Sequence, residues 1–172
     1  VLISTVIWVM LFPSPSYSLR VPNSFQDKDF SQRFKILAQQ LPADKFEREK
    51  RLAARKGVAL AFEKAKKHFN ETGRKLVWCL GGGTNIWDHY IDEISGAEGI
   101  KKYVEFVASS DESTKRMEAR GFDCPGFETL EEGGKIDLLT DGADEITRGG
   151  IAIKGGGGCE KREKEAIAIT KE

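Results

Sequence analysis

The sequence predicts an α/β protein in which helices flank a parallel β-sheet. Two observations lead to this prediction. Over residues 44–172, short apolar runs alternate with segments of helical periodicity, as in chains of βαβ units. Each of four apolar runs is also followed by a small, polar or glycine-rich segment. Because the carboxyl ends of parallel strands lie along one edge of an open sheet, these four segments are expected to converge on a ligand site.

Residues 1–20 are expected to form a signal-peptide-like leader outside the folded domain. The run "VLISTVIWVMLF" is too short to span a bilayer, but it has the length of the apolar core of a signal peptide and small residues follow it. A buried strand is the weaker alternative, because no turn or partner pattern follows. With no methionine or basic segment ahead of the run, we expect the sequence to start inside a longer open reading frame. Residues 21–43 are polar and lack a clear period, which predicts a linker to a domain over residues 44–172.

The first element of this domain is predicted to be a helix from Asp44 to about Phe69, ended by Asn70 and Gly73. Its basic residues outnumber its acidic ones and are expected to lie on a solvated face. Five apolar residues recur at three- and four-residue steps and define a buried stripe. They are Val58, Ala61, Phe62, Ala65 and Phe69.

Two predicted strands come next, each followed by a loop and a helix. "KLVWCL" (75–80) leads through "GGGTN" into an amphipathic helix, and "YVEFVA" (103–108) leads through "SSDEST" into the helix "TKRMEARG" (114–121), closed by Gly121. The apolar face of the first of these helices is formed by Ile86, Tyr90, Ile91 and Ile94.

Two further strands complete the predicted parallel sheet. "IDLLT" (136–140) is followed by "DGADE", and "IAI" (151–153) is followed by "KGGGG" and by the start of a helix in "EKREKEAIAIT" (160–170). The loops "GGGTN", "SSDES", "DGADE" and "KGGGG" are therefore expected to meet, although they are far apart in the sequence.

Charge and cysteine content exclude several classes of function. With 27 basic and 27 acidic side chains, the chain has no net charge that would favour nucleic acid or an anionic membrane. Three cysteines at wide spacing, with no CxxC pair and only two histidines, argue against a disulfide framework and a zinc site. Cys79 lies in an apolar run and is expected to be buried. Cys159 follows the second glycine cluster, where a bystander thiol is favoured over a site residue.

Glycine runs between a strand and a helix let backbone N–H groups approach an anion at a helix N-terminus. Two such runs in one chain favour a phosphate or a similar oxyanion as ligand. Neither run has a known nucleotide-binding spacing, since "GGGT" differs from GxGxxG and "GGGGCEK" lacks the P-loop ending. A tight turn between closely packed backbones explains "GGGT" equally well.

Ionisable residues at the last two strand ends indicate acid–base chemistry. Asp141 and Asp144 directly follow a buried strand, where carboxylates need partners, and Lys154 at the end of the next strand is the obvious one. Glu163 lies one to two helical turns beyond the glycines and is a candidate general base. The alternative is an Asp that ties a turn, a surface lysine and a solvated helical glutamate.

These blocks together resemble the type A ribose-5-phosphate isomerases. The pattern "DGADE" after an apolar strand, then "IKGGGG", then "REK" is specific to that family. "ASSDESTKRMEARGF" and "LGGGT...HYIDEI" are similar to its serine-rich segment and its first glycine loop, and the order and spacing agree from about Lys56 to Lys164. The resemblance implies a Rossmann-like parallel sheet flanked by helices. It also implies that the sequence stops before the smaller C-terminal domain of the family, as a partial sequence does.

The resemblance further implies roles for individual residues. Glu163 matches the catalytic base, which moves a proton between C1 and C2 of the sugar through an enediolate. Asp141 matches the aspartate that opens the furanose ring, while Asp144 and Lys154 match groups that orient the open chain and stabilise charge on its oxygens. No cofactor or metal is implied. The implied substrate-binding residues are Gly83, Thr84, Asn85, Gly142, Ala143, Gly155, Gly156 and Gly157.

The first glycine loop departs from the family pattern. It usually reads glycine-threonine-glycine-serine-threonine and holds the 5-phosphate, whereas "GGGTN" keeps one hydroxyl at Thr84 and has Asn85 in place of another. Aligned backward from "HYIDEI" instead, the last position of the loop falls on Ile86.

The function that follows is an enzyme of the aldose–ketose isomerase type, interconverting D-ribose 5-phosphate and D-ribulose 5-phosphate in the non-oxidative pentose phosphate pathway. The alternative, which the altered loop motivates, is a non-catalytic sugar-phosphate sensor or pseudoenzyme on the same fold. A third alternative, a related sugar-phosphate enzyme or an acyl-transfer fold that shares glycine loops, fits poorly because no nucleophile stands beside a base. The expected partners are a small sugar phosphate and further copies of the complete chain, without nucleic acid or stable membrane association. The leader indicates the secretory pathway or a plastid, and the cytoplasm otherwise.

Overall fold

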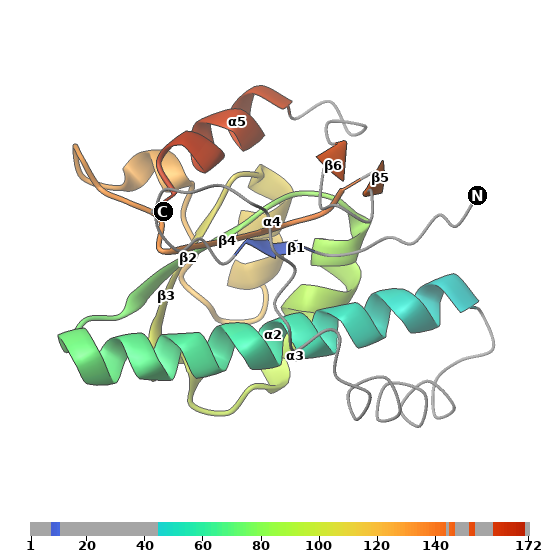
Figure 1. Cartoon of the computed structure of the whole chain (residues 1–172), viewed down its shortest axis with the longest axis horizontal. Helices are drawn as coiled ribbons and strands as arrows, with labels where there is room; N and C mark the ends of the chain where they lie inside the picture. The colour runs from blue at the N-terminus through green and yellow to red at the C-terminus, as the bar shows by residue number, and fades with distance from the viewer. Residues whose placement is uncertain (1–7, 11–44, 144, 147–151, 154–159, 171–172) are drawn as a thin grey trace.

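A mixed four-stranded sheet forms the centre of the protein (Figure 1). The computed structural model describes residues 8–10, 45–143, 145–146, 152–153 and 160–170. The strands are β1 (Trp8–Met10), β2 (Leu76–Leu80), β3 (Val104–Ala108) and β4 (Leu138–Asp141), in the spatial order β1-β4-β2-β3. β2 runs parallel to both β3 and β4, which confirms the predicted α/β fold with a parallel sheet.

The fourth predicted parallel strand is not part of this sheet. β6 (Ala152–Ile153) pairs antiparallel with β5 (Glu145–Ile146) in a separate two-stranded sheet. A parallel strand after β4 would need a crossover connection of a dozen or more residues, and residues 142–151 are too few for one. The prediction of a strand was therefore right about the extended backbone of Ala152 and Ile153 and wrong about the sheet to which they belong, and residue 151 lies outside the described part.

β1 lies inside the part of the sequence that we expected to remain outside the fold. It pairs antiparallel with β4, with Trp8 opposite Asp141 and Met10 opposite Leu139. These three residues thus adopt the strand that the sequence argument treated as the weaker alternative. The leader over residues 1–20 as a whole and the linker over residues 21–43 stay predictions, because their remaining residues lie outside the described part.

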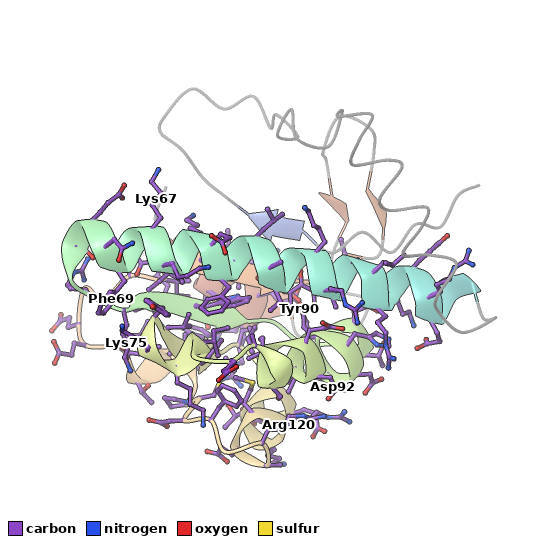
Figure 2. The ribbon with its side chains drawn as sticks, turned by 90° about the horizontal axis from the view of Figure 1, so that it is seen from below. Lys67, Phe69, Lys75, Tyr90, Asp92 and Arg120 are labelled. Atoms are coloured by element: carbon purple, nitrogen blue, oxygen red, sulfur yellow. The ribbon has the colours of Figure 1, made fainter. Side chains whose placement is uncertain are left out.

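Helices α2 (Lys45–Thr72) and α3 (Ile91–Gly96), with the intervening wide turn η2 (Ile86–Tyr90), cover one face of the sheet (Figure 1). The predicted stripe of α2 is confirmed. Val58, Ala61 and Ala65 are buried against the core, and the rings of Phe62 and Phe69 both contact Tyr103. Tyr90 lies beneath α2 (Figure 2), where its hydroxyl approaches Gly57 so closely that a Cβ there would lie 1.7 Å from Oη.

The ends of two helices differ from the prediction. α2 continues through Asn70 to Thr72 and ends at Gly73, whose φ of 69° is the left-handed conformation that glycine adopts readily. α4 (Asp111–Glu118) begins at Asp111 and not at Thr114, because acidic residues are favourable in the first turn of a helix. Its Met117 lies in the same core as α2 and α3.

Helix α5 (Glu160–Ala168) covers the opposite face of the sheet together with the short turn η4 (Phe127–Thr129) (Figure 1). The protein therefore has three layers, with the sheet between two helical layers. A further short turn, η3 (Ile100–Lys102), precedes β3. The smaller core on the α5 side consists of Cys79, Val107, Phe127, Ile136, Leu139 and Ala166.

A buried hydrogen bond links the middle strands on the α2 side. Trp78 Nε1 donates to Thr140 Oγ1 at 2.8 Å, and both side chains are fully buried. Thr140→Val is expected to reduce the free energy of unfolding by about 1–3 kcal/mol, because the indole N–H loses its acceptor away from water. Urea denaturation checks this, with Thr140→Ser as the control that keeps the hydroxyl. Equal midpoints for Thr140→Val and the wild type would contradict it.

Candidate active site

Three of the four predicted loops meet at the carboxyl edge of the parallel strands. Leu80, the last residue of β2, is in register with Ala108 at the end of β3 and with Thr140 of β4. The segments that follow these strands therefore start at the same level. The fourth loop, "KGGGG", lies outside the described residues.

The backbone of Gly81, the first residue of the glycine loop, is held from two sides. Gly81 N donates to Thr140 O at 2.8 Å, and Gly81 O accepts a hydrogen bond of 2.6 Å from Ser113 Oγ. Ser113 in turn accepts a hydrogen bond of 2.9 Å from Trp87 Nε1. The loop is thus fixed to β4 at its amide and to α4 and η2 at its carbonyl.

Asp141 lies directly against this loop. Its side chain is only 5% exposed, and Oδ1 accepts a hydrogen bond of 2.7 Å from Gly142 N. A Cβ added to Gly81 would lie 2.1 Å from both Cγ and Oδ1 of Asp141. The carboxylate therefore occupies the space that only a glycine at position 81 leaves open. Two parts of the predicted site, the first glycine loop and Asp141, are brought together by this contact.

The rest of the loop turns into η2. Gly83 has a φ of 91°, and its carbonyl accepts hydrogen bonds of 3.1 Å from the amides of Ile86 and Trp87. Thr84 is exposed at the edge of the site. Asn85 is only 8% exposed, and its Oδ1 accepts no hydrogen bond from the described residues. The two polar side chains of "GGGTN" thus lie in different environments, one in solvent and one buried.

Glu163 lies in the first turn of α5 and is half-buried. Its neighbour Arg162 contacts Asp111, the first residue of α4, with Nη1 2.6 Å from Oδ1. Asp111 follows the serine pair at the end of β3, so the first turn of α5 comes to the same edge of the sheet as Asp141. The structure places this predicted base at the edge where sequence reasoning expected it.

Other predicted site residues are placed only in part. Gly142 and Ala143 follow β4 and are partly exposed. Five predicted site residues lie outside the described part of the chain, and their roles remain predictions. They are Asp144, Lys154, Gly155, Gly156 and Gly157.

Sequence reasoning missed three residues that organise this edge: Trp87, Ser113 and Arg162. In the charged run "REK" only Glu163 was singled out as a site residue, and nothing in the local sequence of Arg162 points to Asp111. The third serine of "SSDES" is the one usable signal for Ser113, because a small hydroxyl residue in a first helical turn can reach a neighbouring loop.

The described cysteines do not supply a nucleophile. Cys79 is fully buried, as predicted, and burial raises the pKa of its thiol far above the ordinary value. Burial also raises the pKa of Cys124 to about 12. Since the thiolate is the reactive form, both thiols are protonated and inert at neutral pH. Cys159 lies outside the described residues.

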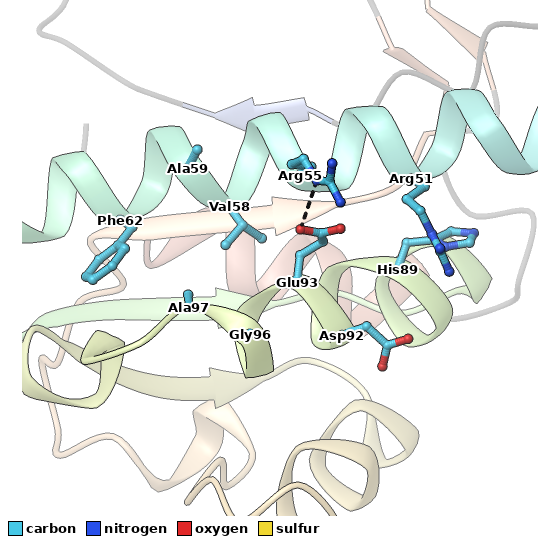
Figure 3. A pocket seen from close by; sticks show the side chains of 10 residues that line it. All are labelled: Arg51, Arg55, Val58, Ala59, Phe62, His89, Asp92, Glu93, Gly96 and Ala97. Carbon is cyan, nitrogen blue, oxygen red and sulfur yellow. Dashed lines mark hydrogen bonds and ion pairs between the residues drawn. The ribbon is translucent and has the colours of Figure 1, made fainter. Parts of the chain in front are cut away.

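A pocket of about 540 Å³ lies between α2 and the η2–α3 segment (Figure 3). It is lined by side chains of both signs, among them Arg55 and Glu93, which form an ion pair of 3.4 Å. None of the site residues predicted from the sequence lines it. Within the described residues there is also no cluster of three or more potential metal ligands and no helix with the length and apolarity of a membrane span.

The fold defines the class of protein, an α/β protein whose candidate site lies at the carboxyl ends of its parallel strands. A family model described as "Ribose 5-phosphate isomerase A (phosphoriboisomerase A)" matches residues 105–172. The matched part of the chain contains Asp141 and Glu163 and is similar to the ribose 5-phosphate isomerase A family. The resemblance inferred from the sequence is thereby confirmed.

Individual relatives agree with the family model over a similar length. The chain is 45% identical over 65 residues to the ribose-5-phosphate isomerase A of Francisella tularensis subsp. novicida (strain U112), and the figures for subsp. holarctica (strain LVS) are the same. These 65 residues are 38% of this chain and 28% of the relatives' length. The solved ribose 5-phosphate isomerase from Plasmodium falciparum is similar over 66% of this chain and 48% of its own, with 26% identity and a TM-score of 0.48.

Proposed function

We propose that the protein is an aldose–ketose isomerase that interconverts D-ribose 5-phosphate and D-ribulose 5-phosphate in the non-oxidative pentose phosphate pathway. One observation carries this proposal. Asp141, inside the block that matches the isomerase family model, packs its buried carboxylate on the Gly81 loop, at the edge that also carries Glu163. An acid–base pair of carboxylates beside a glycine loop is what an anionic sugar undergoing proton transfer requires.

The reaction needs a ring opening and then a proton transfer. Asp141 takes the proton of the C1 hydroxyl as the ring C1–O4 bond breaks and the C1 aldehyde forms. The same proton then passes from Asp141 to O4, which restores the carboxylate. Glu163 then removes the proton from C2. The electrons of the C2–H bond form the C1–C2 double bond, and negative charge moves to O1, which gives an enediolate. Return of the proton from Glu163 to C1, with transfer of the O2 hydroxyl proton to O1, leaves the C2 ketone of ribulose 5-phosphate.

The enediolate carries negative charge and is favoured by positive charge and by N–H donors beside its oxygens. Lys154 is proposed to supply the positive charge, and Asp144 to orient the open chain together with Lys154. The glycines after Lys154 are proposed to supply the N–H donors. These assignments rest on the sequence pattern. The chemistry uses side chains and backbone of the protein and requires neither a metal nor an organic cofactor.

The Gly81–Asn85 loop is proposed to hold the 5-phosphate. Its glycines give an anion close access to the backbone, and the exposed hydroxyl of Thr84 offers a further donor. Asn85 is buried and would contribute through its amide at the base of the loop. The proposal therefore assigns the phosphate contact at the surface to Thr84.

The test is ribulose 5-phosphate formation by the full-length protein, with ribose lacking the phosphate as the control substrate. Turnover of ribose 5-phosphate, much faster than that of ribose, supports the proposal. Absence of turnover with thermal stabilisation by ribose 5-phosphate would replace it with a sugar-phosphate sensor. Absence of both turnover and binding would refute any sugar-phosphate function.

A further inference from the structure

The two ends of helix α5 are attached to the protein in different ways. Its C-terminal end is fixed by apolar packing and backbone pairing. Ala166 is fully buried, and Ile136 N donates to Ile169 O at 3.0 Å just before β4. Thr170 Oγ1 closes the helix with a hydrogen bond of 2.7 Å to Ala166 O. Within the described residues, apolar packing and these hydrogen bonds attach this end of the helix.

The N-terminal end, which carries Glu163, is attached by Arg162. One guanidinium nitrogen lies 2.6 Å from Asp111 Oδ1 and the other 2.7 Å from Glu128 Oε1. The guanidinium centre lies 5.9 Å from the centre of the Phe127 ring. The hydrogen bond from Arg162 lowers the pKa of Asp111, so the carboxylate is charged at neutral pH. We call these three residues, Arg162, Asp111 and Glu128, the clasp.

The two acceptors of the clasp flank the end of β3. Asp111 follows β3 through the serine pair, and Glu128 lies in η4, shortly after Pro125, whose carbonyl accepts a hydrogen bond of 2.9 Å from Ala108 N. The clasp is also close to the backbone here, since a Cβ on Gly126 would lie 2.4 Å from Glu128 Oε2 and 3.4 Å from Arg162 Nη2. Arg162 thus connects the first turn of α5 with both segments that adjoin the carboxyl edge.

We propose that Arg162 is a positioning residue that fixes the first turn of α5, and with it Glu163, against the carboxyl edge of the sheet. As far as it concerns catalysis, this rests on the proposed function, in which Glu163 is the base. Proton transfer demands close alignment, and a displacement of about 1 Å can reduce a rate about 100-fold. Ion pairs between largely exposed groups contribute little to global stability, so the clasp acts on local geometry. Arginine suits this task because its rigid, planar fork presents donors on two separate nitrogens to the two carboxylates, whereas lysine has a single nitrogen on a flexible stem.

The experiment compares Arg162→Gln and Arg162→Lys with Arg120→Gln in the full-length protein. Arg120 is a matched control, because its side chain is 32% exposed against 31% for Arg162 and it pairs with Asp92 on α3, away from α5. The first readout is amide hydrogen exchange of Lys164 and Glu165, whose α-helical acceptors lie in the first turn. The second is kcat and KM for ribose 5-phosphate.

For Arg162→Gln we expect exchange at these two amides to be about 10-fold faster, with the amide of Ile169 unchanged as an internal reference. The kcat is expected to fall about 10- to 100-fold with little change in KM. Arg162→Lys is expected to lie between Arg162→Gln and the wild type, and Arg120→Gln to match the wild type in both readouts.

Unchanged exchange in Arg162→Gln would overturn the proposal whether or not the protein is an isomerase. Faster exchange with an unchanged kcat would overturn the claim that the clasp positions Glu163. If the wild type itself has no turnover, the proposed function fails and the exchange data still decide whether Arg162 fixes the turn. If Arg162→Gln does not fold, Asp111→Asn and Glu128→Gln are tested for the same local increase in exchange. Each of these substitutions removes one of the two ion pairs of Arg162.

Discussion

Glu163→Gln in the full-length protein is expected to lower kcat for ribose 5-phosphate isomerisation about 1000-fold, within the range by which general bases accelerate reactions. Glutamine has nearly the same shape as glutamate, and it cannot take a proton from C2. Because Glu163 is only half-buried, the midpoint of thermal unfolding is expected to change little. KM is also expected to change little, since the proposed phosphate contacts belong to the Gly81–Asn85 loop.

Glu165→Gln provides the matched control for this substitution. Glu165 is exposed on the same helix and pairs with Lys161 at 3.8 Å, so its loss is expected to leave kcat within about twofold of the wild type. The measurement is the initial rate of ketopentose formation for both variants under the same conditions. A Glu163→Gln variant that keeps a tenth or more of the wild-type kcat would show that another group is the base.

Gly81→Ala is expected to damage both activity and stability. The new methyl group would lie 2.1 Å from Cγ and Oδ1 of Asp141 and 2.7 Å from its Cβ, so the carboxylate has to leave its position. The loop cannot yield easily, because the peptide of Gly81 is hydrogen-bonded to Thr140 and Ser113. Overpacking of this kind costs about 1–3 kcal/mol of unfolding free energy. Displacement of Asp141 is expected to reduce kcat about 100-fold.

Chemical denaturation and the isomerase assay measure the two effects, with Gly96→Ala as the control. Gly96 ends α3, and a Cβ there would meet no atom within 4 Å. This substitution is expected to be neutral or to stabilise by about 0.5–1 kcal/mol, since alanine restricts the unfolded chain. If Gly81→Ala denatures at the wild-type urea concentration and turns over normally, the contact between Asp141 and the loop does not exist as described.

The central strands could be predicted from the sequence because each is a short apolar run with a turn signal on both sides. Runs of this kind predict β2, β3 and β4, and the buried apolar stripe predicts α2. An apolar run alone does not show which sheet a strand joins, and the short connection after β4 places Ala152–Ile153 in an antiparallel pair with β5. Sequence reasoning also left Trp8–Met10 outside the sheet, because an edge strand of three residues carries too little pattern to be distinguished from an apolar leader.

Part of the candidate site could likewise be predicted, since strand direction alone brings Asp141 next to the first glycine loop. The clasp could not, because Arg162 and Asp111 are 51 residues apart and nothing local indicates the pair. The same holds for Trp87 and Ser113, which are 26 residues apart. Such contacts depend on how the helices pack against the sheet, and a single sequence contains no pattern that predicts this packing.

The wide turn η2 separates the glycine loop from the buried helix that follows. The amide of Ile91 donates to the carbonyl of Ile86, five residues back, so the turn holds one residue more than an α-helical turn. The family's loop pattern can be aligned forward from the glycines or backward from "HYIDEI", and the two alignments differ by one residue. The extra residue in the wide turn accounts for this difference. Loss of one residue here would convert the turn to an α-helical one. The positions of Gly81 before the turn, and of Ile91 and Ile94 after it, would stay the same. During evolution, the length of this connection can therefore change by one residue without disturbing either the site or the core.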